Sequence, residues 1–282
     1  MRTITNILTS AVLVCSTALA GVAPAYAASC VNETWGKIKE RGKIVVGIKS
    51  DAKPWGFIDT DGKLVGMEAD MAEEVAHTIG VELELVGVQS SNRMQFLEQG
   101  KIDLMIATMS DRKDRRDIVG VVLPNYYTSG TNIMAPKALG IKEWSQLKDK
   151  PVCGLQGSFH NKAIEEHYGA KIIAFDNNAA AKQGLRDKKC MAWVFDDSSI
   201  AADLASGDYA DYEMPLKTEN DNPWALAVPL AERECVFGRF MSGMEFNWLQ
   251  SGRLMELEKK WGIQESAFLS GQKERFRDWL AK

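Results

Sequence analysis

The sequence has few of the features that mark membrane, metal or nucleic-acid proteins. After residue 27 it contains no run of about 18 apolar residues, the length that a membrane-spanning helix needs. It has no CxxC pair, and none of its three histidines is close to a cysteine, so we expect no zinc or other metal site. It has no GxxxxGK[ST] motif, so no nucleotide cofactor is expected. The formal net charge of −4 argues against nucleic acid as a partner.

The first 27 residues have the pattern of a secretory signal peptide. Arg2 opens a short positive region, and residues 7–20 are apolar but too few to span a bilayer. Ala25-Tyr26-Ala27 matches a small-residue cleavage site. We therefore expect cleavage after Ala27, export to the periplasm and no direct membrane insertion of the mature chain.

The mature chain keeps enough residues and cysteines for a cross-linked globular protein. About 255 residues remain after cleavage, which is enough for one large or two medium domains. Four cysteines remain with them, Cys30, Cys153, Cys190 and Cys235. An even number in an oxidising compartment suggests two disulfides, for which three connectivities are possible.

Strand and helix patterns alternate along the chain and then begin again. Short apolar runs predict strands at 43–48, 81–86 and 101–109, with a helix at 67–79 that ends at Gly80. A second series of strands is predicted at 131–135, 151–155, 172–175 and 190–195, with helices between them. Two such α/β units predict two domains with parallel sheets and a ligand site in the cleft between them.

Polar side chains follow the strand predicted at 101–109. Thr108 and Ser110 stand at its end, and Arg115 comes five residues after Ser110. Open α/β sheets bind ligands just past the carboxyl ends of their strands. A guanidinium group with hydroxyl and amide donors beside it suits a carboxylate. The alternative is a solvated helix N-terminus in which neighbouring aspartates neutralise the arginines.

The second unit offers a matching pair of strand ends. Gly157-Ser158 precedes a helix, where free backbone N–H groups favour an anion. Asp196 ends a buried strand and needs a cation, which a ligand ammonium group can supply. The alternative for Asp196 is an N-cap of the following helix, a role that fits Asp197 better.

Seven pieces of the sequence, in order, resemble one family. They are PWGF, DGKLVGMEADMAEEV, SNRMQFLEQGKIDLMIATMS, the arginine five residues after that serine, YYTSG, LQGS and VFDD. The chain resembles the periplasmic amino-acid-binding proteins of ABC transporters (solute-binding protein family 3) over essentially its whole mature length, nearest in motifs to glutamate/aspartate binders.

The resemblance implies a two-lobed α/β fold, the type II periplasmic-binding-protein fold. Each lobe is expected to be a mostly parallel sheet flanked by helices, and the chain is expected to cross between the lobes twice, near 127–131 and 222–225. Residues 28–128 with 225–282 would form the first lobe, and residues 129–224 the second.

The resemblance also implies roles for the strand-end residues. Arg115 is expected to hold the ligand's α-carboxylate with Ser110 and Ser158, and Asp196 to accept the α-ammonium with Thr108. The chain departs from the family pattern at two positions. Phe159 stands where many relatives have a second hydroxyl residue, and Arg112 stands where threonine is common.

The expected contacts with the ligand's side chain come from three residues of the first lobe. Lys49, Ser90 and Arg93 align with positions through which glutamate/aspartate binders hold a side-chain carboxylate. With Arg115 and Asp196 they leave a surplus of two positive charges, which favours an acidic amino acid. Trp55 and Phe159 would equally suit a larger polar or aromatic ligand, so another polar amino acid or an amino-acid conjugate stays an alternative.

The implied lobes also select a disulfide pairing. Cys153 and Cys190 fall on strands that neighbour each other in the flavodoxin-like order 2-1-3. Cys30 and Cys235 both fall in the first lobe. We predict Cys153–Cys190 and Cys30–Cys235, because a bridge between lobes would oppose hinge closure.

The sequence therefore predicts a monomeric transport receptor, without cofactor or catalysis, that delivers an amino acid to ABC transporter membrane subunits. A dehydratase of the cyclohexadienyl or arogenate type is the enzymatic alternative on the same fold, with Glu68 or Asp196 as its acid. A ligand carrier to a sensory receptor is a further alternative.

Overall fold

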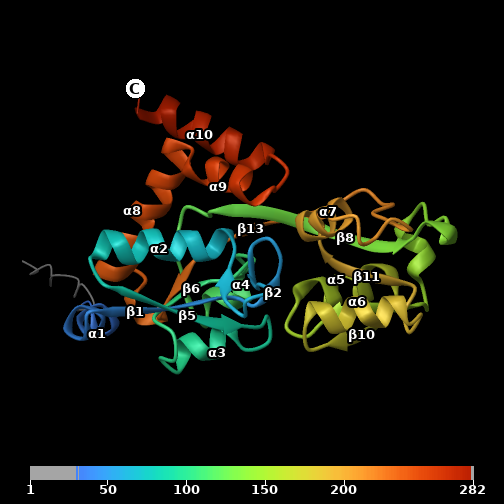
Figure 1. The fold of residues 1–282 in the computed structure, drawn as a ribbon, viewed down its shortest axis with the longest axis horizontal. Helices are drawn as coiled ribbons and strands as arrows, with labels where there is room; N and C mark the ends of the chain where they lie inside the picture. The colour runs from blue at the N-terminus through green and yellow to red at the C-terminus, as the bar shows by residue number, and fades with distance from the viewer. Residues whose placement is uncertain (1–29, 31, 281–282) are drawn as a thin grey trace, which may run out of the picture.

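A computed structural model describes residue 30 and residues 32–280 of the chain (Figure 1). The expected signal peptide and its cleavage site lie outside the described residues. Two α/β bodies, each with its own main sheet, lie side by side and are joined by two long antiparallel strands, β8 (Tyr127–Pro136) and β13 (Glu219–Trp224). We call the body with the five-stranded sheet the first lobe and the body with the six-stranded sheet the second lobe.

The five-stranded sheet of the first lobe has the order β5-β1-β6-β14-β7. Its strands are β1 (Lys43–Lys49), β5 (Glu82–Val88), β6 (Leu104–Ile106), β7 (Gly120–Val121) and β14 (Ala227–Val228). Strands β5, β1 and β6 are parallel, and β14 runs antiparallel to both of its neighbours. The flavodoxin-like order 2-1-3 is thus present in the parallel part of this sheet.

Helices cover the first lobe, and a small sheet lies beside it. The helices are α1 (Glu33–Arg41), α2 (Met67–Ile79), α3 (Arg93–Glu98), α4 (Lys113–Arg116), α8 (Val236–Ser251), α9 (Arg253–Trp261) and α10 (Ala267–Leu280). The small sheet is a meander of β2 (Asp51–Ala52), β3 (Gly56–Ile58) and β4 (Leu64–Val65). Helix α2 has the predicted bounds because Met71, Val75 and Ile79 bury one face and Gly80 ends it with φ 76°.

The second lobe repeats the parallel arrangement. Its sheet order is β10-β9-β11-β8-β12, with β13 paired to β8. Besides β8 and β13, the strands of this sheet are β9 (Pro151–Leu155), β10 (Lys171–Phe175), β11 (Ala192–Asp196) and β12 (Tyr212–Glu213). The helices are α5 (Phe159–Tyr168), α6 (Asn178–Arg186) and α7 (Asp197–Ala205), with short 3₁₀ turns at Lys137–Leu139 and Trp144–Leu147 and, in the first lobe, at Leu230–Glu232.

The expectation of mostly parallel sheets holds for one side of each sheet, strands β5, β1 and β6 in the first lobe and β10, β9 and β11 in the second. In the second lobe β8 pairs antiparallel with β11, β12 and β13, so that antiparallel pairs outnumber parallel ones. Strand β8 begins at Tyr127 and not near residue 131 as expected, because its first half pairs with β13 between the lobes.

The described part of the chain contains two disulfides, and they are the two predicted pairs. The Cα atoms of Cys30 and Cys235 are 5.3 Å apart, and those of Cys153 and Cys190 are 5.6 Å apart. Both distances lie in the range that a disulfide spans. Cys153 lies in β9, and the other bridge fastens the start of the described chain to the residue before α8, so each bridge stays within one lobe.

Candidate functional site

Ten residues from both lobes line a small cavity where the ends of the parallel strands face one another. They are Ser90, Arg93, Thr108, Ser110, Arg115, Ser158, Phe159, His160, Phe195 and Asp196. Eight of them are predicted site residues; His160 and Phe195 are additional. The cavity measures about 10 Å³, at or below the roughly 10–15 Å³ that one water molecule occupies by the same measure. An amino acid can therefore enter only when the lobes move apart.

Lys49 lies behind this cavity and does not line it. Its ammonium Nζ is 2.7 Å from Asp51 Oδ1 and donates to Ser90 Oγ at 3.2 Å. Burial lowers the pKa of Lys49, and the charge of Asp51 opposes that shift. The ion pair with Asp51 removes Lys49 from the predicted surplus of positive charge. A surplus of one remains, because the cavity has Arg93 and Arg115 against Asp196.

Trp55 also lies away from the cavity, in the core of the first lobe. Its ring is fully buried and packs edge-on against Trp224 and Tyr127, with ring centroids 4.8 Å and 4.4 Å away. Trp55 therefore belongs to a cluster of three aromatic rings, and the other two are in edge-to-face contact with it. Trp55 packs between the small sheet and the strands that join the lobes and does not line this cavity, so its contact with a ligand stays a prediction.

Arg93 and Arg115 are two buried cations of the cavity. Arg93 Nη1 donates to the carbonyls of Ala107 and Thr108, the latter at 3.0 Å. Arg115 donates to Ser110 O at 3.1 Å and, across the cleft, to Gly157 O at 3.4 Å. Burial lowers the pKa of both side chains, that of Arg115 to about 9, with the charge of Arg93 as a second cause.

Neither arginine forms an ion pair with a carboxylate of residues 32–280. Two guanidinium groups with only carbonyl partners are therefore held next to one another out of water. Buried charges are normally paired, and a guanidinium group binds a carboxylate through two parallel hydrogen bonds. The cavity is thus built to receive an anion.

Thr108 holds an unusual backbone conformation at the cavity wall. Its φ is 42°, in the left-handed region that a β-branched residue rarely adopts. Its N–H donates to Glu68 Oε1 at 2.6 Å, and Tyr126 OH donates to the same oxygen at 2.7 Å. Glu68 from α2 and Arg93 from α3 therefore hold the Thr108 peptide from opposite ends, which fixes a strained wall of the site. The same turn explains why β6 stops at Ile106, earlier than predicted.

The carboxylate of Asp196 has a protein partner that the sequence analysis did not foresee. Asp196 Oδ1 lies 3.1 Å from Nε2 of the buried His160, and His160 Nδ1 lies 2.7 Å from Thr131 Oγ1. Three elements, β11, α5 and β8, thus contribute to one row of polar groups. The only sequence signal for this contact is the position of His160 in the first turn of a helix that follows a strand end.

Asp197 does not cap α7 with its side chain, contrary to expectation. It is the first residue of that helix, and its Oδ1 accepts from Ser129 Oγ at 2.6 Å and from the Gly130 amide at 3.0 Å. The carboxylate fastens α7 to β8 instead.

The start of α5 brings the second lobe against the first. Ser158 Oγ accepts from the His160 amide at 3.3 Å and so caps the helix. Gly157 has φ 73°, and a Cβ there would stand 2.6 Å from Ser90 O in the first lobe. Only glycine permits this conformation and this close approach.

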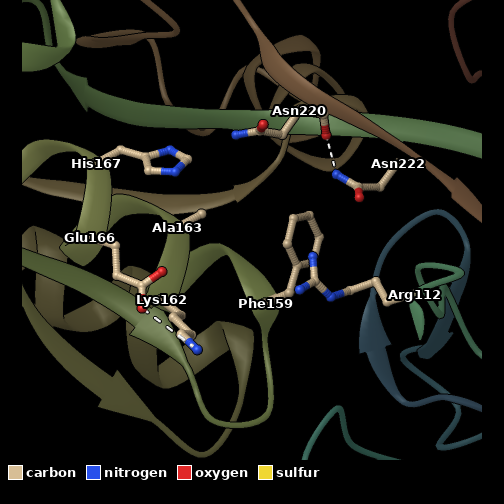
Figure 2. Close-up of a pocket in the computed structure, with 8 residues that line it drawn as sticks. All are labelled: Arg112, Phe159, Lys162, Ala163, Glu166, His167, Asn220 and Asn222. Atoms are coloured by element: carbon tan, nitrogen blue, oxygen red, sulfur yellow. Dashed lines mark hydrogen bonds and ion pairs between the residues drawn. The ribbon is translucent and has the colours of Figure 1, made fainter. Parts of the chain in front are cut away.

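Further interlobe contacts flank the cavity. Asp51 Oδ2 accepts from the Asn178 amide at 2.8 Å, and Asn178 Nδ2 donates to Asp51 O at 3.1 Å. On another side, Arg112 lies over the ring of Phe159, 5.3 Å from its centroid, beside a wider cavity of about 250 Å³ (Figure 2). Lys162, Glu166 and His167 of α5 line that outer cavity with Asn220 and Asn222 of β13.

Membrane-spanning helices and metal-binding clusters are both absent from the described residues. None of the helices in residues 32–280 combines the length and apolar character that crossing a bilayer requires. Within the same residues, no three histidine, cysteine, aspartate or glutamate side chains are grouped as they would be around a metal ion.

Comparison with known proteins places the chain. A family model described as bacterial extracellular solute-binding proteins, family 3, matches residues 44–265. The ABC transporter glutamine-binding protein of Bacillus subtilis is 28% identical over 239 residues, which cover 82% of this chain and 85% of that protein. The glutamate/aspartate import solute-binding protein of Salmonella typhimurium is 24% identical over 268 residues, 90% of this chain and 87% of that protein.

A solved structure agrees with these relatives. A mutant of the ArgBP from T. maritima superposes with a TM-score of 0.75 at 26% identity, covering 81% of this chain and 98% of that one. The chain belongs to the bacterial extracellular solute-binding proteins of family 3, and it is a solute-binding receptor and not an enzyme.

Proposed function

We propose that this protein closes its two lobes on an acidic amino acid outside the cytoplasm and delivers it to an ABC importer. The observation that carries the proposal is the pair of buried arginines, Arg93 and Arg115, beside the single carboxylate of Asp196. An amino acid with two carboxylates and one ammonium group matches two cations and one anion. Relatives whose names state glutamine or glutamate/aspartate as ligands support an amino acid.

Each proposed contact is supported by the position of a residue in or behind the cavity. Arg115, with Ser110 and Ser158 beside it in the cavity, binds the α-carboxylate. Asp196 and Thr108 accept from the α-ammonium group. Arg93 and Ser90 bind the side-chain carboxylate, with Lys49 supporting Ser90 from behind.

We also propose the lobe limits given by the sequence, residues 28–128 with 225–282 and residues 129–224. The proposal further includes a monomeric receptor in the periplasm, released by cleavage after Ala27. The lobe limits are supported by the strands β8 and β13, which run from one lobe to the other near both limits.

A thermal-shift screen of the twenty amino acids and simple dicarboxylates, followed by calorimetry, tests the proposal. We expect L-glutamate or L-aspartate to stabilise the protein. Arg115→Gln should weaken binding by about thirtyfold to several thousandfold, because a ligand carboxylate loses its buried partner at a cost of about 2 to 5 kcal/mol. Arg116→Gln is the matched control, since Arg116 pairs with Asp111 outside the cavity. Stabilisation by lysine, arginine or histidine but by no acidic amino acid would end the acidic proposal.

A further inference from the structure

The row Thr131–His160–Asp196 joins the proposed ammonium acceptor to a group that can change its charge. His160 is 1% exposed and Asp196 is 4% exposed, and both line the cavity. Thr131 is fully buried and does not line it. The threonine hydroxyl is thus placed to contact the imidazole and not a ligand.

The two hydrogen bonds of His160 fix the form of its neutral ring. Nε2 faces Asp196 Oδ1 at 3.1 Å, so a hydrogen on Nε2 is required, because a bare nitrogen would face a carboxylate oxygen. Nδ1 then accepts from the Thr131 hydroxyl at 2.7 Å. In this form the imidazole orients Asp196 and leaves the negative charge of Asp196 available to a ligand.

The protonated ring fits the same positions without rearrangement. Thr131 Oγ1 can accept a hydrogen bond as readily as donate one, so it can receive the second N–H at Nδ1. The imidazolium and the carboxylate then form a neutral pair. Asp196 keeps its place but no longer offers a net charge to an ammonium group.

We propose that His160 is a positioning residue through which acid weakens recognition of the ligand's ammonium group. This inference rests on the proposed function, because it takes Asp196 as the ammonium acceptor. Histidine is the side chain whose ordinary titration falls in the physiological range. The protein would hold its amino acid near neutral pH and release it more readily in acid.

Charged groups on neighbouring elements of the described chain also act on the imidazole of His160. Asp196 on β11 favours its protonation, and Arg93 on α3 and Arg115 on α4, which line the same cavity, oppose it. The rings of Phe159 and Phe195 that pack near it, with centroids 4.0 Å and 5.9 Å away, carry no charge. Burial raises the pKa of Glu68, which holds Thr108 on the cavity wall, to about 7, so its effect has to be separated from that of His160 by the experiment.

Comparing two ligands shows how much the ammonium group alone contributes to binding. L-glutamate and glutarate share two carboxylates, and only glutamate has the ammonium. Dissociation constants of both are measured by calorimetry at about pH 8 and about pH 6. For the unmodified protein we expect the preference for glutamate over glutarate to fall at least about fivefold in acid, which corresponds to about 1 kcal/mol.

Three variants decide which residue is responsible. In His160→Gln the amide can donate to Asp196 and accept from Thr131 but does not titrate, so the ligand preference should change less than about twofold with pH, well under 1 kcal/mol. His160→Ala should bind glutamate more weakly at both pH values, and its rescue by glutamine shows the positioning role. Glu68→Gln should keep the pH response of the unmodified protein.

The outcomes are distinct. The inference is overturned if the ligand preference of the unmodified protein does not depend on pH. It is also overturned if the pH dependence survives in His160→Gln or disappears in Glu68→Gln. If neither glutamate nor glutarate binds at either pH, the proposed function fails and the inference falls with it.

Discussion

The guanidinium group of Arg112 in the first lobe lies over the ring of Phe159 in the second lobe, 5.3 Å from the ring centroid (Figure 2). These are the two positions at which the sequence departs from the pattern of the family it resembles. The two departures are therefore linked. Phe159 replaces a common hydroxyl residue and Arg112 replaces a common threonine, and together they form a cation–π contact between the lobes. The contact lies beside the cavity that holds the proposed ligand, since Phe159 lines both that cavity and the outer one.

Arg112→Gln should weaken binding of the proposed ligand by about two- to fivefold, because a partly exposed cation–π contact contributes about 0.5 to 1 kcal/mol. The contact is made between lobes, so its loss favours their separation. Calorimetry gives the affinity, and small-angle scattering gives the separation. Arg116→Gln removes the same charge from the end of α4, the helix that Arg112 precedes, without touching the second lobe. An equal effect of both variants would contradict this role.

The buried carboxyl group of Glu68 should make the free energy of unfolding depend on pH. Burial raises its pKa to about 7, against hydrogen bonds from Tyr126 and Thr108 that lower it. The folded state therefore binds a proton more tightly than the unfolded chain between about pH 4.5 and pH 7, so stability falls as pH rises through that window, by about 3 kcal/mol in total.

Glu68→Gln should remove this contribution, because the amide oxygen can still accept from Thr108 and Tyr126. Urea unfolding of both proteins across the window gives the free energy of unfolding. Parallel profiles of the two proteins would show that Glu68 does not titrate as described.

The sequence predicts those parts of the molecule that local patterns determine. Helix α2 has its predicted bounds because its apolar face and its terminal glycine are both local signals. Five cavity residues, Thr108, Ser110, Arg115, Ser158 and Asp196, were predicted because strand ends and polar residues can be read together along the chain. The resemblance to the family added Ser90, Arg93 and Phe159.

The remaining features depend on partners that are distant in sequence. Trp55 packs in the core because Tyr127 and Trp224 meet it there, and nothing near Trp55 reports those contacts. The partnership of Asp196 with His160 depends on how β11 and α5 are placed on the sheet. The ion pair of Lys49 with Asp51 depends on where β1 ends and β2 begins, which the sequence does not show. For this reason Lys49 was assigned to the ligand.

Replacing the buried carboxyl group of Glu245 in α8 by an apolar side chain should make the folded protein more stable. Glu245 is fully buried, and neither carboxylate oxygen has a hydrogen-bond partner among the described residues. Burial raises its pKa well above the usual value; the Leu226 amide, too far or too poorly aligned for a hydrogen bond of normal geometry, opposes this shift only in part. Glu245→Met, similar in length and apolar, should stabilise the fold by about 1 to 3 kcal/mol near neutral pH, the cost of an unsatisfied buried polar group. The gain should shrink in acid, where the unfolded chain is protonated as well.

Chemical unfolding at neutral and acidic pH measures both effects. Glu274→Met, at an exposed position of α10, is the control for a change of charge and should leave stability almost unchanged. Destabilisation by Glu245→Met would mean that the carboxyl group has a structural role that its contacts do not show.

The contact of Asp51 with Asn178 predicts how easily the lobes separate. Asp51 pairs with Lys49 in the first lobe and accepts from the amide of Asn178, the first residue of α6 in the second lobe. The carboxylate thus meets the positive end of that helix, which favours closure. Asn178→Asp places a second carboxylate against the first and should weaken ligand binding by about fivefold or more, since like charges brought together across an interface repel.

The same change should increase the radius of gyration of the ligand-free protein in small-angle scattering, because repulsion acts between the lobes and not within one. Ala179→Asp is the control: it adds the same charge to the same turn of α6 at an exposed position next to Asn178. If the two variants lowered affinity equally, net charge and not the contact with Asp51 would be the cause. If Asn178→Asp alone weakened binding and enlarged the protein, then Asp51, which also neutralises Lys49 behind Ser90, would couple the ligand site to lobe closure.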